Sequence, residues 1–310
     1  MKTKTLYLCV FLVLVLVIAG CQEPVEVPAR ESVIPSDAIK MSPENDTLPP
    51  KLLSDEYEQP VPLPYPVNTR GAEDSAFIMP DGETLYVWFT PNNRMDAIEQ
   101  SQDLVTGIYK YEKLGDGWSE PERIWLVEPG QPHLDGCGFF FEDQAWICGV
   151  RQEIEGIHWF TSEYQEGAWT NAELADFNPA YEVGELHFSQ DGQQLYFHSS
   201  RTGGKGGLDI WMSELVNGEW GAPINLANIN SEYDEGWPAL NPLGDELWIS
   251  KNYSLWRSKK VDGVWQVPVE IISALAGEAT IDQEGNVYFT HHYYENDIMI
   301  EADIYVAYKK

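Results

Sequence analysis

The sequence predicts an all-β protein, a β-propeller of five blades, from three observations. Tryptophans recur as Trp118, Trp169, Trp220 and Trp265, at intervals of 51, 51 and 45 residues. Short runs that alternate aromatic and aliphatic residues lie between them, and Asp-Gly or related pairs separate these runs. A fixed period of this length, built from short strands and tight turns, is typical of propeller blades.

Each repeat is expected to contain four strands. The first strand ends at the Asp-Gly turn, because Asp and Gly tolerate the positive φ that tight hairpins require. The second strand lies at 85–88, 145–147, 195–197, 247–249 and 287–289. The third lies at 107–109, 156–159, 209–211, 254–256 and 303–305, and the fourth begins at the periodic tryptophan.

The fifth repeat has no fourth strand of its own, since its recognisable pattern stops near residue 308. An open ring would expose an unpaired strand edge, which natural sheets avoid. Residues 57–63 match residues 220–226 of the third repeat, and their prolines suit an edge strand. We therefore predict that residues 57–63 form the outer strand of the last blade and close the ring.

The N-terminus predicts export and attachment to a lipid. A basic start precedes an apolar run from Leu6 to Ala19, which is shorter than the ~20 residues of a membrane-spanning helix. Residues 1–20 are assigned to a secretory signal peptide. The residues that end at Cys21 resemble a bacterial lipobox, which implies acylation of Cys21 and binding to a lipid bilayer. An ordinary signal peptide with a coincidental cysteine is the alternative.

The mature chain then divides into a tether and one domain. Residues 21–56 are acidic and rich in proline, so we expect an extended tether that buries little apolar surface. Residues 57–310 have a length suited to one propeller. The expected location is the cell envelope, where the lipid-anchored protein faces the periplasm or the exterior.

The chain carries a net charge of −31, from 50 acidic residues against 19 lysines and arginines. This balance excludes nucleic acid as a partner, because phosphates require Lys and Arg. A solvated, strongly acidic surface is the simplest interpretation. No cofactor is predicted, although acids gathered at one place would also suit Ca²⁺.

Two cysteines, Cys137 and Cys148, remain in the mature domain besides Cys21. If Glu142 and Asp143 form a two-residue turn, Cys137 faces Cys148 across the hairpin. An exported protein enters an oxidising compartment, so a disulfide between them is predicted. Two packed thiols are the alternative. No metal site is predicted, because no further ligand lies near these cysteines in the sequence.

Residues 188–238 resemble the PD40 repeats, which are WD40-like propeller repeats also found in TolB-like proteins. The resemblance rests on Ser-Gln-Asp-Gly at 189–192, Ser-Ser-Arg at 199–201, Asp-Ile-Trp at 209–211 and Asn-Leu at 225–226. It is specific over about residues 180–250 and implies an extracytoplasmic interaction module. TolB-like proteins also carry a separate N-terminal domain that this chain does not match, so no Tol-system role follows.

Acidic residues lie at or near the start of each innermost strand, where a propeller lines its central channel. As candidate ligand-binding residues they are Glu73, Asp74, Asp135, Glu185, Asp234, Glu235 and Glu278. Carboxylates crowded in a funnel raise one another's pKa and attract cations. In the alternative interpretation they accept hydrogen bonds that hold the loops of the repeat.

These observations favour a membrane-anchored binding module for a protein or a carbohydrate. The alternative is an enzyme similar to glycoside hydrolases, since five-bladed propellers of that kind use carboxylates of successive innermost strands. The candidate catalytic residues are then Asp74, Asp135 and Glu185, and Trp237 is placed to stack on a sugar. Carboxyls that converge in an open pocket would favour the enzyme, and carboxyls bound into loops would favour the binding module.

Overall fold

A computed structural model describes residues 25–310, except 153, 171, 176–182 and 297. The predicted signal peptide, residues 1–20, and the predicted lipid attachment site Cys21 lie outside the described residues. Within the described ranges, no helix has both the length and the apolar character that a membrane crossing requires.

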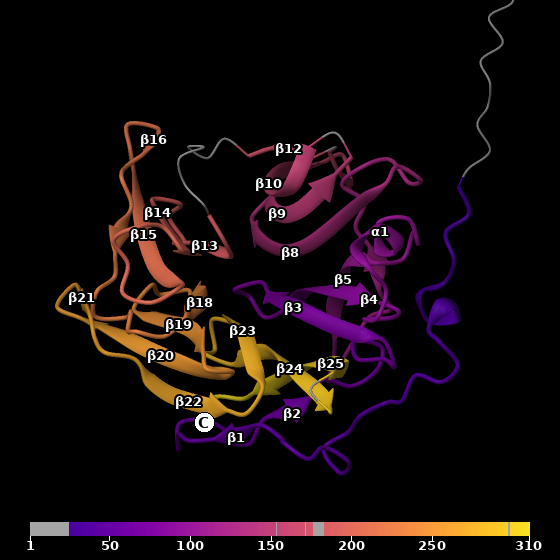
Figure 1. The fold of residues 1–310 in the computed structure, drawn as a ribbon, viewed down its shortest axis with the longest axis horizontal. Coiled ribbons are helices and arrows are strands. Elements are labelled where there is room, and N and C mark those ends of the chain that lie inside the picture. The colour runs from indigo at the N-terminus through magenta and orange to yellow at the C-terminus, as the bar shows by residue number, and fades with distance from the viewer. Residues whose placement is uncertain (1–24, 153, 171, 176–182, 297) are drawn as a thin grey trace, which may run out of the picture.

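The chain forms consecutive antiparallel sheets that lie around a common centre, as in a β-propeller (Figure 1). The first sheet contains β3 (Ala72–Ile78), β4 (Thr84–Thr90), β5 (Gly107–Leu114), β6 (Gly117–Trp118) and β7 (Glu122–Arg123). The second contains β8 (His133–Phe141), β9 (Gln144–Arg151), β10 (Ile154–Gln165), β11 (Ala168–Trp169) and β12 (Glu173–Leu174). The third contains β13 (Leu186–Phe188), β14 (Gln194–Ser199), β15 (Asp209–Val216), β16 (Glu219–Trp220) and β17 (Ile224–Asn225).

The remaining sheets also contain strands from the N-terminal part of the chain. The fourth contains β18 (Glu235–Leu240), β19 (Glu246–Lys251), β20 (Ser254–Val261), β21 (Val264–Trp265), β22 (Val269–Ser273) and β1 (Lys51–Leu52). The last contains β23 (Ala276–Ile281), β24 (Val287–Glu295), β25 (Ile298–Ala307) and β2 (Val61–Pro62), and a parallel pairing of Ala302 in β25 with Ala72 in β3 joins it to the first sheet. Two short helices, η1 (Arg30–Val33) and α1 (Ala97–Gln100), lie outside the sheets.

The order of strands within each sheet follows the predicted repeat. The innermost strands β3, β8, β13, β18 and β23 face the common centre in Figure 1. The periodic tryptophans lie in the short outer strands β6, β11, β16 and β21, which confirms their predicted position in the fourth strand. The acidic residues at or near the start of each innermost strand therefore lie at one end of the ring.

Residues 57–63 lie along the last sheet. Val61 is opposite Val306 and Pro62 is opposite Tyr305, in an antiparallel pairing of β2 with β25. The backbone N–H of Leu63 also donates to the carbonyl oxygen of Ile304, at 2.8 Å. The regular strand is shorter than predicted, because Pro60, Pro62 and Pro64 cannot donate to a ladder.

Apolar and aromatic contacts join neighbouring sheets. The rings of Tyr86 in the first sheet and Phe140 in the second are stacked, with centroids 3.6 Å apart. Phe139 and Phe188 join the second sheet to the third, with centroids 5.2 Å apart. Full burial of such a side chain contributes roughly 1.5–3 kcal/mol, so these contacts fix how the sheets sit side by side.

Residues 25–56 differ from the predicted free tether, because they pack along the outside of the sheets (Figure 1). Arg30 is 5% exposed, and its guanidinium donates to Tyr111 and to the carbonyl oxygen of Pro66. Lys40 is paired with the buried carboxylates of Glu301 and Asp303. The segment has too few apolar residues for a core of its own. Its hydrogen bonds and ion pairs with the sheets, such as those of Arg30 and Lys40, could not be predicted from composition alone.

Candidate functional site

The innermost strands carry irregularities at one level of the ring. The register of β3 against β4 shifts between Asp74 and Phe77, and the other inner hairpins, except the third, shift at the equivalent position. Ser75, Trp237 and Glu278 have positive φ values of 49°, 50° and 57° at these shifts. Such β-bulges turn a side chain away from the regular alternation of the strand.

A small cavity, here called the central cavity, lies at this level and has a volume of about 50 Å³. Each sheet contributes one bulge-level residue to its wall, namely Ser75, Cys137, Glu185, Trp237 and Glu278. Further along the same strands, Phe77, Phe139 and His187 form a packed aromatic group, in which ring centroids of Phe139 and His187 are 4.8 Å apart. This packing closes the channel below the cavity.

Three side chains above the cavity form what we call the mouth group: Asp74, Glu278 and His292. One potential ligand atom from each lies within 4.8 Å of the others. Ser75 Oγ donates to Glu278 Oε2 at 2.6 Å, and the backbone N–H of Ser75 donates to Asp74 Oδ1 at 2.8 Å. His292 Nε2 lies 3.7 Å from Asp74 Oδ2, and the two side chains are each 21% exposed. First and last sheets therefore meet at this group.

The crowding of these acids separates their pKa values. Burial, and then the negative charges of Asp74 and Glu185, raises the pKa of Glu278 well above its usual value. Burial also raises the pKa of Glu185 to about 7. Burial opposes the ionisation of Asp74 too, but its interaction with His292 outweighs this and lowers the pKa of Asp74. The pKa values of Asp74 and Glu278 are therefore displaced in opposite directions.

A larger pocket, here called the aromatic pocket, lies between the fourth and last sheets and has a volume of about 570 Å³. Glu278 and His292 belong to its wall, so it is continuous with the mouth group. Tyr233, Tyr253 and Tyr294 line it with side chains that are 52%, 72% and 39% exposed. Its other polar or aromatic lining residues include Asp234, Trp237 and Lys251.

Two of the predicted ligand-binding acids are bound into loops. Glu73 and Glu235 are fully buried. Each accepts a hydrogen bond from a backbone N–H four residues earlier, Thr69 at 3.0 Å and Ser231 at 2.9 Å. The hydroxyls of the same two residues also donate to these carboxylates. These two acids therefore hold the loop before the innermost strand, as the alternative interpretation of the repeat expected.

Asp135 lies at the equivalent position of the second sheet and is also fully buried. Arg151 Nη2 is 2.7 Å from its Oδ1 atom. Asp135 is therefore paired with Arg151 and is not part of the mouth group, so Asp74, Asp135 and Glu185 do not form one close group among the described residues. Asp74, Glu185 and Glu278 are the carboxyls that converge there.

Asp234 lies at the edge of the aromatic pocket, where its Oδ1 atom accepts from the backbone N–H of Leu208 at 2.8 Å. His292 and the exposed Tyr253 were not among the sequence-based candidates. A signal for His292 was present, because it lies on β24, the strand that pairs with the innermost strand β23. No sequence signal marked Tyr253, which adopts a positive φ of 55° in the turn after β19.

The cysteine hairpin has the predicted turn but not the predicted bond. Phe141 is paired with Gln144 across Glu142 and Asp143, which confirms the two-residue turn. Cys137 and Cys148 are nevertheless free thiols, so the expected disulfide is corrected. At the bulge the backbone N–H of Cys137 also donates to Cys148 Sγ, with N and Sγ 3.0 Å apart. Disulfide formation requires a more specific approach of the two side chains.

Two groups of side chains could hold a cation, within the residues that the structure describes. One is the mouth group. The other, here called the thiol group, comprises Cys137, Cys148 and Glu185, whose potential ligand atoms also lie within 4.8 Å of one another. The two groups differ in chemistry, because the first offers carboxylate and imidazole ligands and the second offers two sulfurs.

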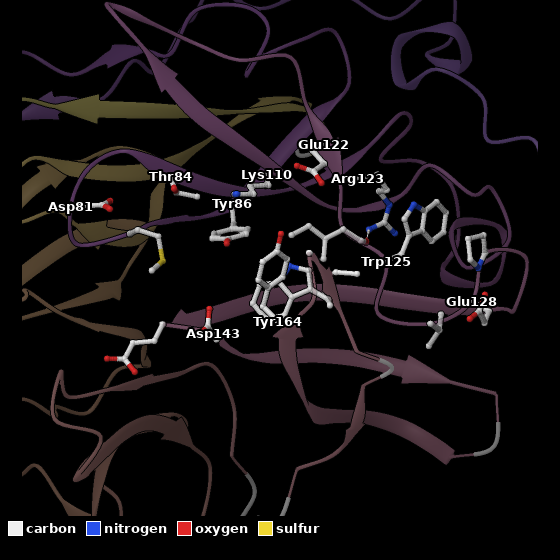
Figure 2. A pocket seen from close by; sticks show the side chains of 18 residues that line it. Asp81, Thr84, Tyr86, Lys110, Glu122, Arg123, Trp125, Glu128, Asp143 and Tyr164 are labelled. Atoms are coloured by element: carbon white, nitrogen blue, oxygen red, sulfur yellow. Dashed lines mark hydrogen bonds between the residues drawn. The ribbon is translucent and has the colours of Figure 1, made fainter.

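A side groove of about 490 Å³ lies between the first and second sheets, away from both groups (Figure 2). Tyr86, Trp125 and Tyr164 line it, and Figure 2 shows Arg123 and Lys110 on one wall. The Arg123 guanidinium donates to the backbone carbonyl oxygens of Thr106 at 2.9 Å and Ile108 at 3.1 Å. These hydrogen bonds tie the Arg123 side chain to the fold.

No protein-family model matches the sequence, and no curated protein does. Solved structures that are similar include a protein assigned as TolB from Agrobacterium tumefaciens, at 14% identity over 74% of this chain and 73% of that one, with a TM-score of 0.42. An endo-arabinase from Bacteroides thetaiotaomicron VPI-5482 is 14% identical over 79% of this chain and 96% of that one, with a TM-score of 0.46. At these values the similarity concerns the fold alone.

Proposed function

We propose that this protein is a five-bladed β-propeller, closed by β2 in the last sheet, that binds a carbohydrate at the surface of a cell-envelope membrane. Acylated Cys21 would hold it there, as the N-terminal sequence implies. The binding site is the aromatic pocket together with the mouth group. The observation that carries this proposal is the pocket of about 570 Å³ that combines exposed tyrosines with carboxylates.

The chemistry of the pocket wall suits a sugar better than an ionic ligand. Ring faces of Tyr253 and Tyr233 offer apolar surface for the C–H face of a pyranose, while carboxylates accept hydrogen bonds from hydroxyl groups. The cation nearest the pocket, Lys251, is committed to Glu235, with Nζ and Oε1 3.0 Å apart. With a net charge of −31 on the whole chain, a neutral ligand rich in hydroxyls is the favoured class.

Hydrolysis of a glycosidic bond is the second candidate, and the spacing of two carboxyls favours it. Oxygen atoms of Asp74 and Glu278 lie no more than 4.8 Å apart, which is nearer the ~5–5.5 Å between carboxyls of retaining glycosidases than the ~6.5–9.5 Å of inverting ones. Their pKa values are displaced in opposite directions. Asp74 would act as the ionised nucleophile and Glu278 as the general acid.

Titration of a glycan panel against the protein that lacks only residues 1–21 tests the proposal. Replacement Tyr253→Ala removes an exposed ring from the aromatic pocket, so the affinity for a bound glycan should fall about tenfold, or ~1.4 kcal/mol. Tyr164→Ala removes an exposed ring from the side groove and serves as the matched control. Loss of affinity in Tyr164→Ala alone would move the site to the side groove and overturn the proposal.

The same samples separate binding from hydrolysis. If the second candidate is correct, reducing ends accumulate with the unmodified protein and not with Glu278→Gln. If the protein only binds, bound glycan is recovered intact from both proteins. A glycan panel without any binding or cleavage would contradict both functions.

A further inference from the structure

The thiol group lies on the wall of the central cavity, where two sheets meet. Cys137 is in β8 and Cys148 is in β9 of the second sheet, and Glu185 directly precedes β13 of the third. Cys137 is 8% exposed, and the other two side chains are half-buried. The sequence separates Glu185 from the cysteines by a whole strand and a loop, so only the fold brings the three together.

The spacing of the ligand atoms suits a tetrahedral cation. Bonds of ~2.3 Å to sulfur and ~2.1 Å to oxygen place the ligand atoms of a tetrahedral zinc site about 3.6–3.8 Å apart. The sulfurs and a carboxylate oxygen of the thiol group lie within 4.8 Å of one another. Small rotations of side chains therefore suffice to close the group around an ion.

The surroundings also favour a cation. The carboxyl of Glu278 lines the same cavity, and its described wall contains no lysine or arginine. The cavity volume of about 50 Å³ exceeds the ~10–15 Å³ that one water molecule requires. Three protein ligands and one water complete a four-coordinate site that stays open toward the channel.

The backbone supports a metal-bound thiolate at Cys148. The N–H of Cys137 donates to Cys148 Sγ at 3.0 Å, and hydrogen bonds of this kind orient and stabilise a ligand that carries negative charge. Sulfur ligands select soft or borderline ions such as Zn²⁺ over Ca²⁺ and Mg²⁺. The mouth group offers one imidazole and two carboxylates, so it lacks the sulfur ligands of the thiol group.

We propose that Cys137, Cys148 and Glu185 bind one thiophilic divalent cation of the zinc class, with water in the fourth position. None of these three ligands belongs to the mouth group or to the described wall of the aromatic pocket. Both cysteine thiols release their protons to solvent on binding, and no oxidant or reductant takes part.

Metal analysis after dialysis with Zn²⁺ tests this proposal on the protein that lacks only residues 1–21, whose cysteines are Cys137 and Cys148. One Zn²⁺ per chain is expected, and Co²⁺ in its place should give a thiolate-to-metal absorption band. Cys148→Ser and Glu185→Gln should each weaken Zn²⁺ binding by more than the ~10–100-fold that loss of an outer partner costs. His292→Ala alters the mouth group and the wall of the aromatic pocket but no residue of the thiol group, so it should leave Zn²⁺ affinity at the thiol group unchanged.

Several results would overturn the proposal. Zn²⁺ that stays bound in Cys148→Ser but is lost in His292→Ala would assign the ion to the mouth group. The absence of bound metal in protein with two titratable thiols would exclude the site. Protein prepared without reductant that has no titratable thiol, and so contains the disulfide, would exclude it as well. Glycan titration of the same variants keeps this result separate from that for the aromatic pocket.

Discussion

Glu56 shows how one residue ties the N-terminal part of the chain to the sheets. Its carboxylate accepts from Arg257 Nη2 at 2.5 Å in the fourth sheet and from Lys309 Nζ at 2.7 Å beyond the last strand. The hydrogen bonds from Arg257 and then Lys309 lower the pKa of Glu56 from 4.5 to about 2. Its ionised form is therefore favoured by folding.

The sign of the pH effect follows from this direction. Because the folded pKa lies below the unfolded one, Glu56 contributes stability above about pH 4.5 and loses it as the pH falls toward 2. Glu56→Gln should lower the free energy of unfolding at pH 7 by about 1 kcal/mol. The substitution should also flatten the pH dependence of the free energy of unfolding between about pH 4.5 and pH 2. Urea titrations can measure this change. Glu58→Gln, two positions away and exposed, is the control, and equal effects in both variants would contradict this role.

Residue-scale chemistry was the hardest to predict from the sequence. The repeat pattern placed Glu73, Asp135 and Glu235 at one aligned position, and the structure does give them one buried environment. The sequence did not indicate that Thr69 and Ser231 donate hydrogen bonds to Glu73 and Glu235, or that Arg151 forms an ion pair with Asp135. Those partners depend on side-chain orientation at the bulges, which local pattern does not encode.

At the scale of elements, the pairing of β2 with β25 connects the N-terminal and C-terminal parts of the domain. Leu63 is 4% exposed beside β25, while Val61 in the same segment is 45% exposed. Leu63→Ala should therefore lower the free energy of unfolding by about 2–3 kcal/mol. Val61→Ala should change it by less than about 0.5 kcal/mol. Similar small effects in both variants, measured by urea unfolding, would show that this segment does not close the last sheet.

Strands and turns followed the sequence closely, because their signals are local. The turn at Glu142 and Asp143 and the tryptophans in the outer strands lie where alternation and turn chemistry indicate. The N-terminal segment did not follow its composition. Proline and acidic residues correctly indicated no core of its own, but Arg30 and Lys40 find buried partners on sheets that lie far away in the sequence.

At the scale of the whole molecule, the ring brings distant acids into contact. Asp74 in the first sheet and Glu278 in the last are separated by most of the domain, yet their carboxyl oxygens lie within 4.8 Å. Crowding by Asp74 and burial raise the pKa of Glu278. Because the folded pKa exceeds the unfolded one, this group destabilises the folded state above its unfolded pKa.

The approach of Asp74 to Glu278 across the ring is tested most directly by urea unfolding at pH 7 and pH 4. The proteins to compare with the unmodified one are Glu278→Gln, Asp74→Asn and the double variant. The account predicts that Glu278→Gln raises the free energy of unfolding at pH 7, that the gain shrinks at pH 4, and that the part due to the charge of Asp74 disappears when Asp74→Asn is already present, while the part due to burial remains. The account would be contradicted if the change in the free energy of unfolding in the double variant equalled the sum of the two single changes within ~0.3–0.5 kcal/mol, as is typical of distant sites. Such additivity would mean that the two carboxyls do not meet.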